Sequence, residues 1–203
     1  MKKIKNIIED VRDSNLTDDE VIEYIKNYNI DINNTKNQNG WSLLHYCALD
    51  NRIKLINFLI ESGIDINIKD HNGWTPLVCT VVHEVVEPFK ILIQNGAEIN
   101  MKIPTLGGKT LFSYSLSCIN QDIVRLLIDS GVSINEKDLS GDTALHIAIK
   151  TKNKELVNYL IDIGVDLDIQ DNLGWTPLYT AIEHEEYEIA KKLIQKGANK
   201  NLK

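Results

Sequence analysis

Hydrophobic and polar positions along this 203-residue chain repeat at intervals of 33 to 35 residues. Each interval contains two short patterns in which apolar residues recur at every third or fourth position. This spacing places the apolar residues on one face of a helix, so every interval predicts two amphipathic helices. The first helices of the five intervals share one core position, which is occupied in turn by Leu44, Leu77, Phe112, Leu145 and Leu178. The second helices share an apolar pair, which is in turn Leu59-Ile60, Leu92-Ile93, Leu127-Ile128, Leu160-Ile161 and Leu193-Ile194.

Glycines follow the same interval. Ten of the eleven fall into two series, and only Gly107 lies outside them. Glycine permits the positive φ that a tight turn or a helix end requires, so we expect one series before each first helix and the other after each second helix. A fixed period of this size indicates a solenoid. The first series is Gly40, Gly73, Gly108, Gly141 and Gly174, and the second is Gly63, Gly96, Gly131, Gly164 and Gly197.

The repeated blocks share a motif. NGWSLLHYCA, NGWTPLVCTV and SGDTALHIAI align with one another, and the second helices end in segments such as LIESGIDIN and LIQNGAEIN. These blocks resemble the ankyrin repeat, whose signature is GxTPLHxA followed by a helix ending LLxxGAdvN. The resemblance implies an all-α fold, a solenoid of stacked helix-turn-helix units joined by β-hairpin loops. Its five repeats span 37–69, 70–102, 103–137, 138–170 and 171–203, and we expect them to form one continuous domain.

Capping signals agree with these helices. Thr75-Pro76 and Thr176-Pro177 place a hydroxyl at the N-cap and a proline at the first helical position. Ser42, Thr110 and Thr143 keep the capping hydroxyl without the proline. The motif therefore predicts where each first helix begins.

The two ends resemble caps of the stack. Residues 1–36 contain two further helical patterns, the second of which ends with Asn29 where the repeats have glycine. Asparagine tolerates the left-handed conformation better than other non-glycine residues. We therefore expect a degenerate N-terminal capping repeat over 1–36 and no appended catalytic or effector domain at either end. The last helix has a polar outer face suited to a C-terminal cap, consisting of Glu188, Lys191, Lys192, Gln195 and Lys196.

Charge and composition narrow the choice of partners. The formal net charge of −7 argues against binding to nucleic acids and anionic membranes, and it favours a basic protein partner. No apolar run approaches the about 20 residues that span a bilayer. Three cysteines without a CxxC pair fit free thiols in a reducing compartment. We expect a cytoplasmic monomer.

The three tryptophans directly follow glycines of the first series. In the ankyrin family this position lies on the hairpin and faces the concave binding surface. The aligned column is Trp41, Trp74, Lys109, Asp142 and Trp175. Tryptophan is enriched at interface hot spots, which favours partner contact through this column, most of all through Trp41 and Trp74. The alternative is that each tryptophan packs on the next hairpin.

The hairpin tips and the ends of the first helices complete the expected binding surface. Apolar residues exposed together on such a surface would indicate a partner site, whereas single exposed apolar residues are ordinary. By family geometry the tips include Gln38, Asn39, His71, Asn72, Leu106, Leu139, Ser140, Asn172 and Leu173. The helix ends include Leu49, Asp50, Val82, His83, Ser117, Cys118, Glu183 and His184.

No catalytic or cofactor site is expected. His45 and His146 occupy the TPLH position, which the resemblance assigns to a structural hydrogen bond. No HExxH motif, phosphate-binding loop or acid–base–nucleophile set is found, so the sequence predicts neither an enzyme nor a bound cofactor or metal. Of the three thiols, Cys47 is expected in the core, Cys79 near the helix surface and Cys118 exposed.

The pattern is irregular around residues 83–108. Pro88 falls early in a second helix, where only the first turn tolerates proline well. The next junction is two residues longer than the others, and Thr105 stands where the other hairpins have aspartate or asparagine. A tolerated surface insertion is the preferred interpretation, and a loop that contacts a partner is the alternative.

The resemblance implies protein–protein recognition without a cofactor, through a preformed surface that loses little entropy on binding. A general adaptor is one form of this function. A dedicated inhibitor, either a viral host-factor binder or a bacterial toxin-neutralising immunity protein, is the alternative.

Overall fold

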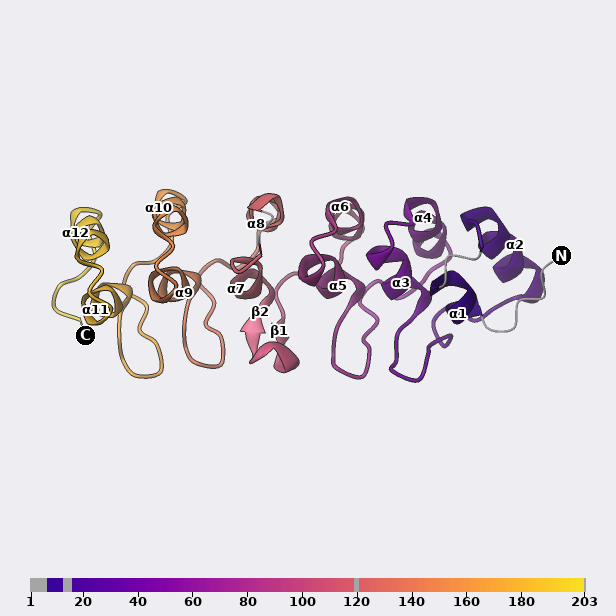
Figure 1. The fold of residues 1–203 in the computed structure, drawn as a ribbon, viewed down its shortest axis with the longest axis horizontal. Helices are drawn as coiled ribbons and strands as arrows, with labels where there is room; N and C mark the ends of the chain where they lie inside the picture. The colour runs from indigo at the N-terminus through magenta and orange to yellow at the C-terminus, as the bar shows by residue number, and fades with distance from the viewer. Residues whose placement is uncertain (1–6, 13–15, 119–120, 203) are drawn as a thin grey trace. The chain divides into compact units, whose positions relative to one another are not determined.

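The computed structural model describes residues 7–12, 16–118 and 121–202. Over these residues the chain forms pairs of short helices, and each predicted repeat contains one pair (Figure 1). The N-terminal pair is α1 (Ile7–Arg12) and α2 (Asp18–Tyr28). The later pairs are α3 (Leu43–Leu49) with α4 (Ile53–Glu61), α5 (Pro76–Val82) with α6 (Val86–Gln94), α7 (Leu111–Ser115) with α8 (Gln121–Asp129), α9 (Ala144–Lys150) with α10 (Lys154–Asp162), and α11 (Pro177–Glu183) with α12 (Tyr187–Gln195).

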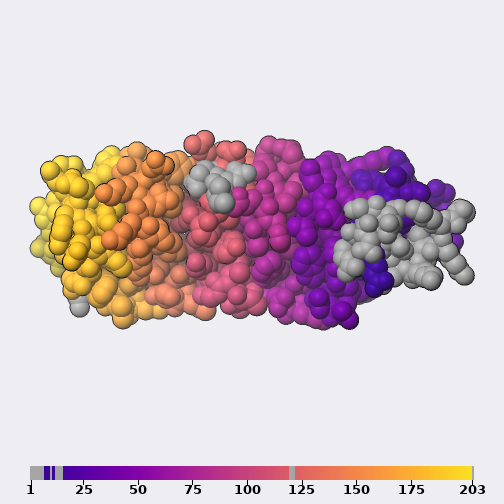
Figure 2. Space-filling view, viewed as in Figure 1, coloured from indigo at the N-terminus to yellow at the C-terminus, as the bar shows by residue number. Residues whose placement is uncertain are grey.

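The chain divides into two compact units. The first comprises residues 1–99 and 118–126, and the second comprises 100–117 and 127–203. Within the first unit α3 packs on α5 and α4 on α6, and within the second α9 packs on α11 and α10 on α12. Figure 2 shows the last two repeats, in orange and yellow, in close contact. The predicted stacking of neighbouring pairs is therefore present within each unit, while the repeat boundaries and their grouping into one domain stay predictions.

The capping residues begin the first helices as expected. Ser42, Thr75, Thr110, Thr143 and Thr176 are the N-caps of α3, α5, α7, α9 and α11. A threonine hydroxyl accepts a hydrogen bond from the backbone N–H three residues later in α5, α7 and α11. Pro88 lies in the first turn of α6, where its missing N–H costs no helical hydrogen bond.

Non-glycine residues with a left-handed backbone conformation occur at one helix end and in the turns between paired helices. Asn29 is the C-cap of α2 with φ 48°, as predicted. The sequence did not predict a second set of positive φ values, in the turn between the two helices of a pair. These residues are Asn51, Glu84, Lys152 and Glu185, each eleven residues after a glycine of the first series. Non-glycine residues adopt this conformation at a cost of about 1–2 kcal/mol. At Glu84, Lys152 and Glu185 the packing of the helix pairs therefore overrides local preference.

Amide and carboxylate side chains join consecutive repeats at the ends of the second helices. In each case an Asn or Asp Oδ1 accepts a hydrogen bond from a backbone N–H of the next repeat, 2.7–3.0 Å away. The acceptors satisfy backbone donors that lie outside the helices, so they fix the spacing of the stack. The pairs are Asn33 with Asp65, Asn67 with Glu98, Asn100 with Ser133, Asn135 with Asp166, and Asp168 with Asn199.

Gly141 is needed for a close approach as well as for its positive φ. A Cβ at this position would lie 2.4 Å from the backbone N of Asn172, whereas at Gly174 the nearest atom would be 3.9 Å away. Both glycines have φ near +78°. Substituting each of these two glycines therefore separates the free-energy cost of backbone strain from that of the close contact between hairpins.

We expect Gly174→Ala to lower the free energy of unfolding by about 1–2 kcal/mol through its positive φ. Gly141→Ala should cost at least about 1 kcal/mol more, because the backbone of Asn172 must also move. Urea unfolding of the two variants measures the difference. Equal losses would show that the two hairpins do not approach as closely as the structure has them.

The irregular junction forms a small hairpin of its own. β1 (Lys102–Ile103) pairs antiparallel with β2 (Lys109–Thr110), and a 3-10 turn over Pro104–Leu106 lies between them. The two additional residues are thus absorbed into an ordered turn. The first helix that follows, α7, has only five residues, against seven in α5 and α9.

The N-terminal helix pair is anchored by Arg52. Its guanidinium is bound to the Asp18 carboxylate at 2.7 Å and donates to the backbone carbonyls of Leu16, at 2.7 Å, and Val11, at 3.3 Å. The other Asp18 oxygen accepts a hydrogen bond from the backbone N–H of Leu55. One mostly covered cation, whose side chain is 10% exposed, therefore joins α1, α2 and the start of α4.

Candidate functional site

Four of the hairpin loops are each held by the side chain of one Asp or Asn residue. In the loop before α5, Asp70 Oδ1 accepts hydrogen bonds from the backbone N–H groups of Asn72 and Trp74, both at 2.8 Å. The Asp70 N–H in turn donates to the Trp74 carbonyl oxygen. Equivalent bonds are made by Asn37, Asp138 and Asp171 in their own loops. The tips are thereby fixed without any partner.

Neighbouring tips are also bound to each other within each unit. In the first unit the backbone N–H of His71 donates to the carbonyl oxygen of Asn39 at 3.1 Å. In the second, the side-chain amide of Asn172 donates to the carbonyl oxygen of Leu139 at 2.8 Å. These bonds fix each tip relative to the next, so the pair presents a preformed surface.

Most of the predicted contact residues are accessible. Asn39, Asp50, His71, Asn72, His83 and Leu139 are exposed, and Trp41, Leu49, Trp74, Val82, Leu106, Lys109 and Trp175 are half-buried. Leu139 and Leu173, at the tips of the last two hairpins, are 65% and 68% exposed. Two large apolar side chains on fixed loops are the strongest candidates for partner contact.

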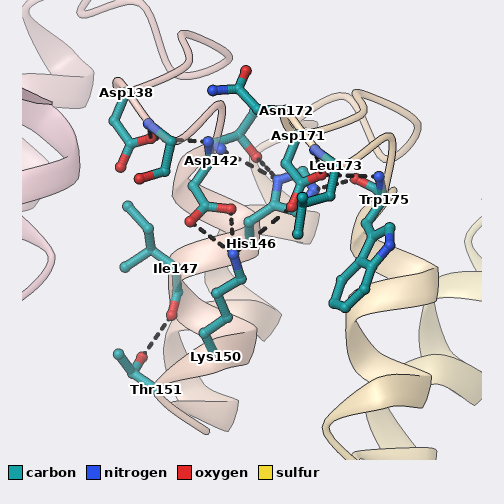
Figure 3. Close-up of polar contacts among 12 residues, drawn as sticks. Asp138, Asp142, His146, Ile147, Lys150, Thr151, Asp171, Asn172, Leu173 and Trp175 are labelled. Carbon is teal, nitrogen blue, oxygen red and sulfur yellow. Dashed lines mark hydrogen bonds and ion pairs between the residues drawn. The ribbon is translucent and has the colours of Figure 1, made fainter.

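The burial of Asp142 corrects the predicted set of partner-contact residues. Only 7% of it is exposed, and both of its carboxylate oxygens accept hydrogen bonds from the Lys150 ammonium, at 2.6 and 2.8 Å (Figure 3). Asp171 of the next hairpin lies 3.8 Å from the same ammonium and is also buried. Asp142 therefore holds two hairpins together through Lys150 and is not offered to a partner.

Trp41 has a corresponding role in the first unit. Its indole N–H donates to Asp70 Oδ2 of the next hairpin at 3.0 Å, and its ring lies 5.1 Å from that of Tyr46. Trp41 and Asp142 stand in the same column of the repeat. The tryptophan donates directly to the next aspartate, whereas Asp142 needs a cation because it faces another carboxylate. This geometry favours packing on the next hairpin for Trp41. The ring of Trp175 lies 5.1 Å from that of Tyr179, which belongs to its own repeat.

His45 and His146 make the structural hydrogen bonds that the resemblance implied. The backbone N–H of Ser42 donates to His45 Nδ1 at 3.2 Å, so this nitrogen carries no proton and Nε2 donates to the Trp74 carbonyl at 3.0 Å. Thr143, His146 and Trp175 repeat the arrangement in the second unit. Each neutral imidazole thus joins its own helix cap to the next hairpin.

Burial lowers the pKa of both His45 and His146 below the ordinary value for histidine. The unfolded chain therefore binds more protons than the folded chain below about pH 6.5, and stability must fall as the pH is lowered from there. We expect the free energy of unfolding to decrease between pH 7 and pH 5. In a His45→Gln, His146→Gln variant, stability at pH 7 should be lower and this decrease smaller. An unchanged pH dependence in the variant would contradict the assignment.

All three cysteines are buried, which corrects the expectations for Cys79 and Cys118. Burial raises the pKa of Cys79 to about 12 and that of Cys118 to about 11, and it also raises the pKa of Cys47. The Cys118 thiol lies 3.4 Å from the Val81 carbonyl oxygen and donates to it. Thiols with such pKa values are poor nucleophiles, so they belong to the packing.

Among the residues that the structure describes, no group of three or more His, Cys, Asp or Glu side chains is placed to hold a metal ion. Within the same ranges no helix is long and apolar enough to cross a membrane.

Comparisons with known proteins match this geometry. The family model for ankyrin repeats (3 copies) matches residues 13–103, 64–138 and 111–203. A chain from the solved structure of the predatory endopeptidase Bd0816 of Bdellovibrio bacteriovorus in complex with the immunity protein Bd3460 is similar, with a TM-score of 0.77 and 24% sequence identity. The match covers 96% of this chain and 100% of that one. No curated protein sequence matches. With its paired helices, capped first helices and fixed hairpins, the chain belongs to the ankyrin-repeat family.

Proposed function

We propose that this protein–protein interaction module binds its partner through the hairpin tips and the exposed ends of the first helices. The observation that carries the proposal is the combination of rigid loops with exposed apolar tips. Leu139 and Leu173 are exposed, yet the loops that hold them are fixed by Asp138 and Asp171. A preformed apolar contact costs little entropy when a partner covers it.

The partner is a protein, and we propose that it is basic where it meets this acidic chain. Exposed Asp50 is one acidic group on the proposed surface. Complementary charge would increase the rate of association, and this effect weakens as salt is added. We further propose that the unbound chain is a monomer, which sedimentation equilibrium measures directly.

We expect a Leu139→Ser, Leu173→Ser variant to bind the partner at least about tenfold more weakly, a loss of about 1.4 kcal/mol. Its stability should stay within about 0.5 kcal/mol of the parent, because both side chains are exposed. The partner is first cross-linked and identified in the native cell, and its affinity is then measured with purified proteins by calorimetry. Tyr28→Ser is the matched control, because Tyr28 is 58% exposed and belongs to α2, not to a hairpin.

An equal affinity of parent and Leu139→Ser, Leu173→Ser variant would contradict the proposed surface. So would a larger loss from Tyr28→Ser than from the hairpin variant. Circular dichroism of each variant shows that any loss of affinity does not come from unfolding.

A dedicated inhibitor is the second candidate. It is favoured by the similar solved structure, which is that of an endopeptidase in complex with an immunity protein. In this form, the chain would mask the active surface of one tightly bound partner. Adding the purified chain in equimolar amount should then abolish the activity of the partner. Retained activity at saturation would favour the adaptor.

A further inference from the structure

Three exposed asparagines of the first unit directly precede a glycine. Asparagine is a thermally labile residue, and glycine has no side chain to hinder attack of its backbone nitrogen on the asparagine side chain. In each pair the glycine N–H donates to the backbone carbonyl oxygen three residues earlier, at 2.9–3.1 Å. The pairs are alike in these respects, so their other contacts decide which one reacts. They are Asn39-Gly40, Asn72-Gly73 and Asn95-Gly96.

The peptide group between Asn39 and Gly40 is held by the next hairpin. The Asn39 carbonyl oxygen accepts a hydrogen bond from the backbone N–H of His71 at 3.1 Å. A Cβ at Gly40 would lie 2.9 Å from that His71 nitrogen and 2.7 Å from the ring carbon Cδ2. Ring closure between the Asn39 side chain and the Gly40 nitrogen requires this peptide group to rotate into line with the side chain. The contact with His71 therefore opposes the reaction.

Asn95 is held through its side chain instead. It is the C-cap of α6, and its amide Nδ2 donates to the backbone carbonyl oxygen of Ile91 at 2.8 Å. Cγ can approach the Gly96 nitrogen only after this hydrogen bond breaks, and breaking it has a cost in free energy. The bond therefore opposes the reaction at Asn95.

Asn72 is restrained least. No described residue of the first unit donates to its carbonyl oxygen, and none lies within 4 Å of a Cβ placed on Gly73. Its side-chain amide is 3.5 Å from Asp70 Oδ2, at the outer limit of a hydrogen bond. The same Oδ2 already accepts the indole N–H of Trp41 at 3.0 Å. Both the side chain and the peptide group of Asn72 can therefore turn toward each other.

We propose that Asn72 is a deamidation site, with water as the co-reactant. The Gly73 nitrogen bonds to Asn72 Cγ, the Cγ–Nδ2 bond breaks, and the side-chain amide leaves as ammonia with the proton of the glycine N–H. Water then opens the cyclic imide. Opening at the new bond to Cγ gives aspartate, whereas opening at the original main-chain bond gives isoaspartate, whose main chain runs through Cγ.

Isoaspartate at this position releases the hairpin tip. Asp70 Oδ1 accepts hydrogen bonds from the backbone N–H groups of Asn72 and Trp74, both at 2.8 Å. Isoaspartate adds one carbon to the main chain between these two N–H groups, so Asp70 no longer holds both at this distance. The new carboxylate also repels that of Asp70, because like charges at close range disfavour each other.

Digestion with trypsin places the three asparagines in separate peptides, 37–52, 70–90 and 91–102. The full chain is kept at neutral pH and physiological temperature, and samples are digested at intervals. Mass spectrometry then follows the replacement of amide by carboxylate, and labelling with an isoaspartate methyltransferase identifies isoaspartate. We expect Asn72 to react at least about fivefold faster than Asn39, the factor in rate that one hydrogen bond is worth. In urea the two rates should become nearly equal, because both asparagines precede Gly-Trp.

Two variants test the cause of the difference. His71→Pro removes the N–H that holds the Asn39 carbonyl, and proline is favoured at this position of a turn in which His71 and Asn72 both have negative φ. This variant should raise the rate at Asn39 about fivefold. Asn72→Ser is the control, which should leave peptide 70–90 unmodified and the rate at Asn39 unchanged. Thermal unfolding by circular dichroism checks that both variants keep their fold.

The released tip is read from amide exchange. The modified chain is separated from the parent by ion exchange, and NMR should show faster exchange of the Trp74 backbone amide. The Trp41 backbone amide is the internal reference, because Asn37 Oδ1 in its own loop accepts its hydrogen bond. Unchanged exchange at Trp74 would contradict the release.

The site assignment fails if Asn39 or Asn95 reacts as fast as Asn72 in the folded chain. It also fails if the rates at Asn39 and Asn72 differ as much in urea as in the folded chain, because the contacts then have no effect. These measurements use no partner, so their outcome is independent of the proposed function.

Discussion

Replacing Lys150 with methionine is expected to destabilise the second unit by about 3 kcal/mol. The ammonium lies between the carboxylates of Asp142 and Asp171, which are 7% and 6% exposed. Removing one partner of a buried ion pair typically costs about 3–5 kcal/mol, because the remaining charge keeps its desolvation penalty. Lys150 keeps some contact with water, which places the expected loss at the lower end of this range. Urea unfolding followed by circular dichroism gives the change.

Two further variants separate this contact from general effects of lost charge. Lys152→Met removes an exposed lysine 3.6 Å from Glu186 and should cost less than about 1 kcal/mol. Adding Asp142→Trp to Lys150→Met should recover much of the loss, because an indole N–H would donate to Asp171 as Trp41 donates to Asp70. Equal losses from Lys150→Met and Lys152→Met would show that the two hairpins do not depend on this cation.

Arg52→Met is expected to cost about 3 kcal/mol and to release the N-terminal helix pair. The substitution removes hydrogen bonds to Asp18, Leu16 and Val11, and leaves the two carbonyl groups without this donor. Hydrogen bonds to charged groups contribute about 1.5–3 kcal/mol each, but a methionine side chain retains part of the packing. Hydrogen exchange should report the release as faster exchange of the backbone amides in α2.

Lys54→Met provides the matched control for Arg52→Met. Lys54 forms an ion pair with Asp19, also between α4 and α2, but both side chains are mostly exposed. Exposed pairs contribute about 0–1 kcal/mol, so this variant should exchange almost as the parent does. If Arg52→Met leaves exchange in α2 unchanged, the Arg52 guanidinium does not hold the N-terminal helix pair in place.

Much of the fold could be predicted because the repeat makes each residue type informative at five places. The N-caps and the left-handed Asn29 follow from local preferences that a single sequence displays. The positive φ of Glu84 and Glu185 does not, since the packing of each helix pair imposes it against the preference of glutamate. The burial of Cys79 and Cys118 was not predicted, because a single small residue in or just after a short helix has no pattern that separates a covered side from an open one.

The candidate site was predicted less completely. Exposure of the hairpin tips followed from the resemblance, but the burial of Asp142 depends on Lys150, eight residues later, and on the carboxylate of the next hairpin. Such a three-residue contact has no linear motif.

Hydroxyl-radical footprinting of the chain with and without its captured partner tests the central claim most directly. It reads side-chain accessibility, so it reports on the exposed leucines of the hairpin tips and on Tyr28 in one experiment. Binding through the tips predicts that oxidation of Leu139, Leu173 and His71 falls in the complex while oxidation of Tyr28 does not change. Protection of Tyr28 and of the second helices, with the hairpin leucines still oxidised, would contradict it.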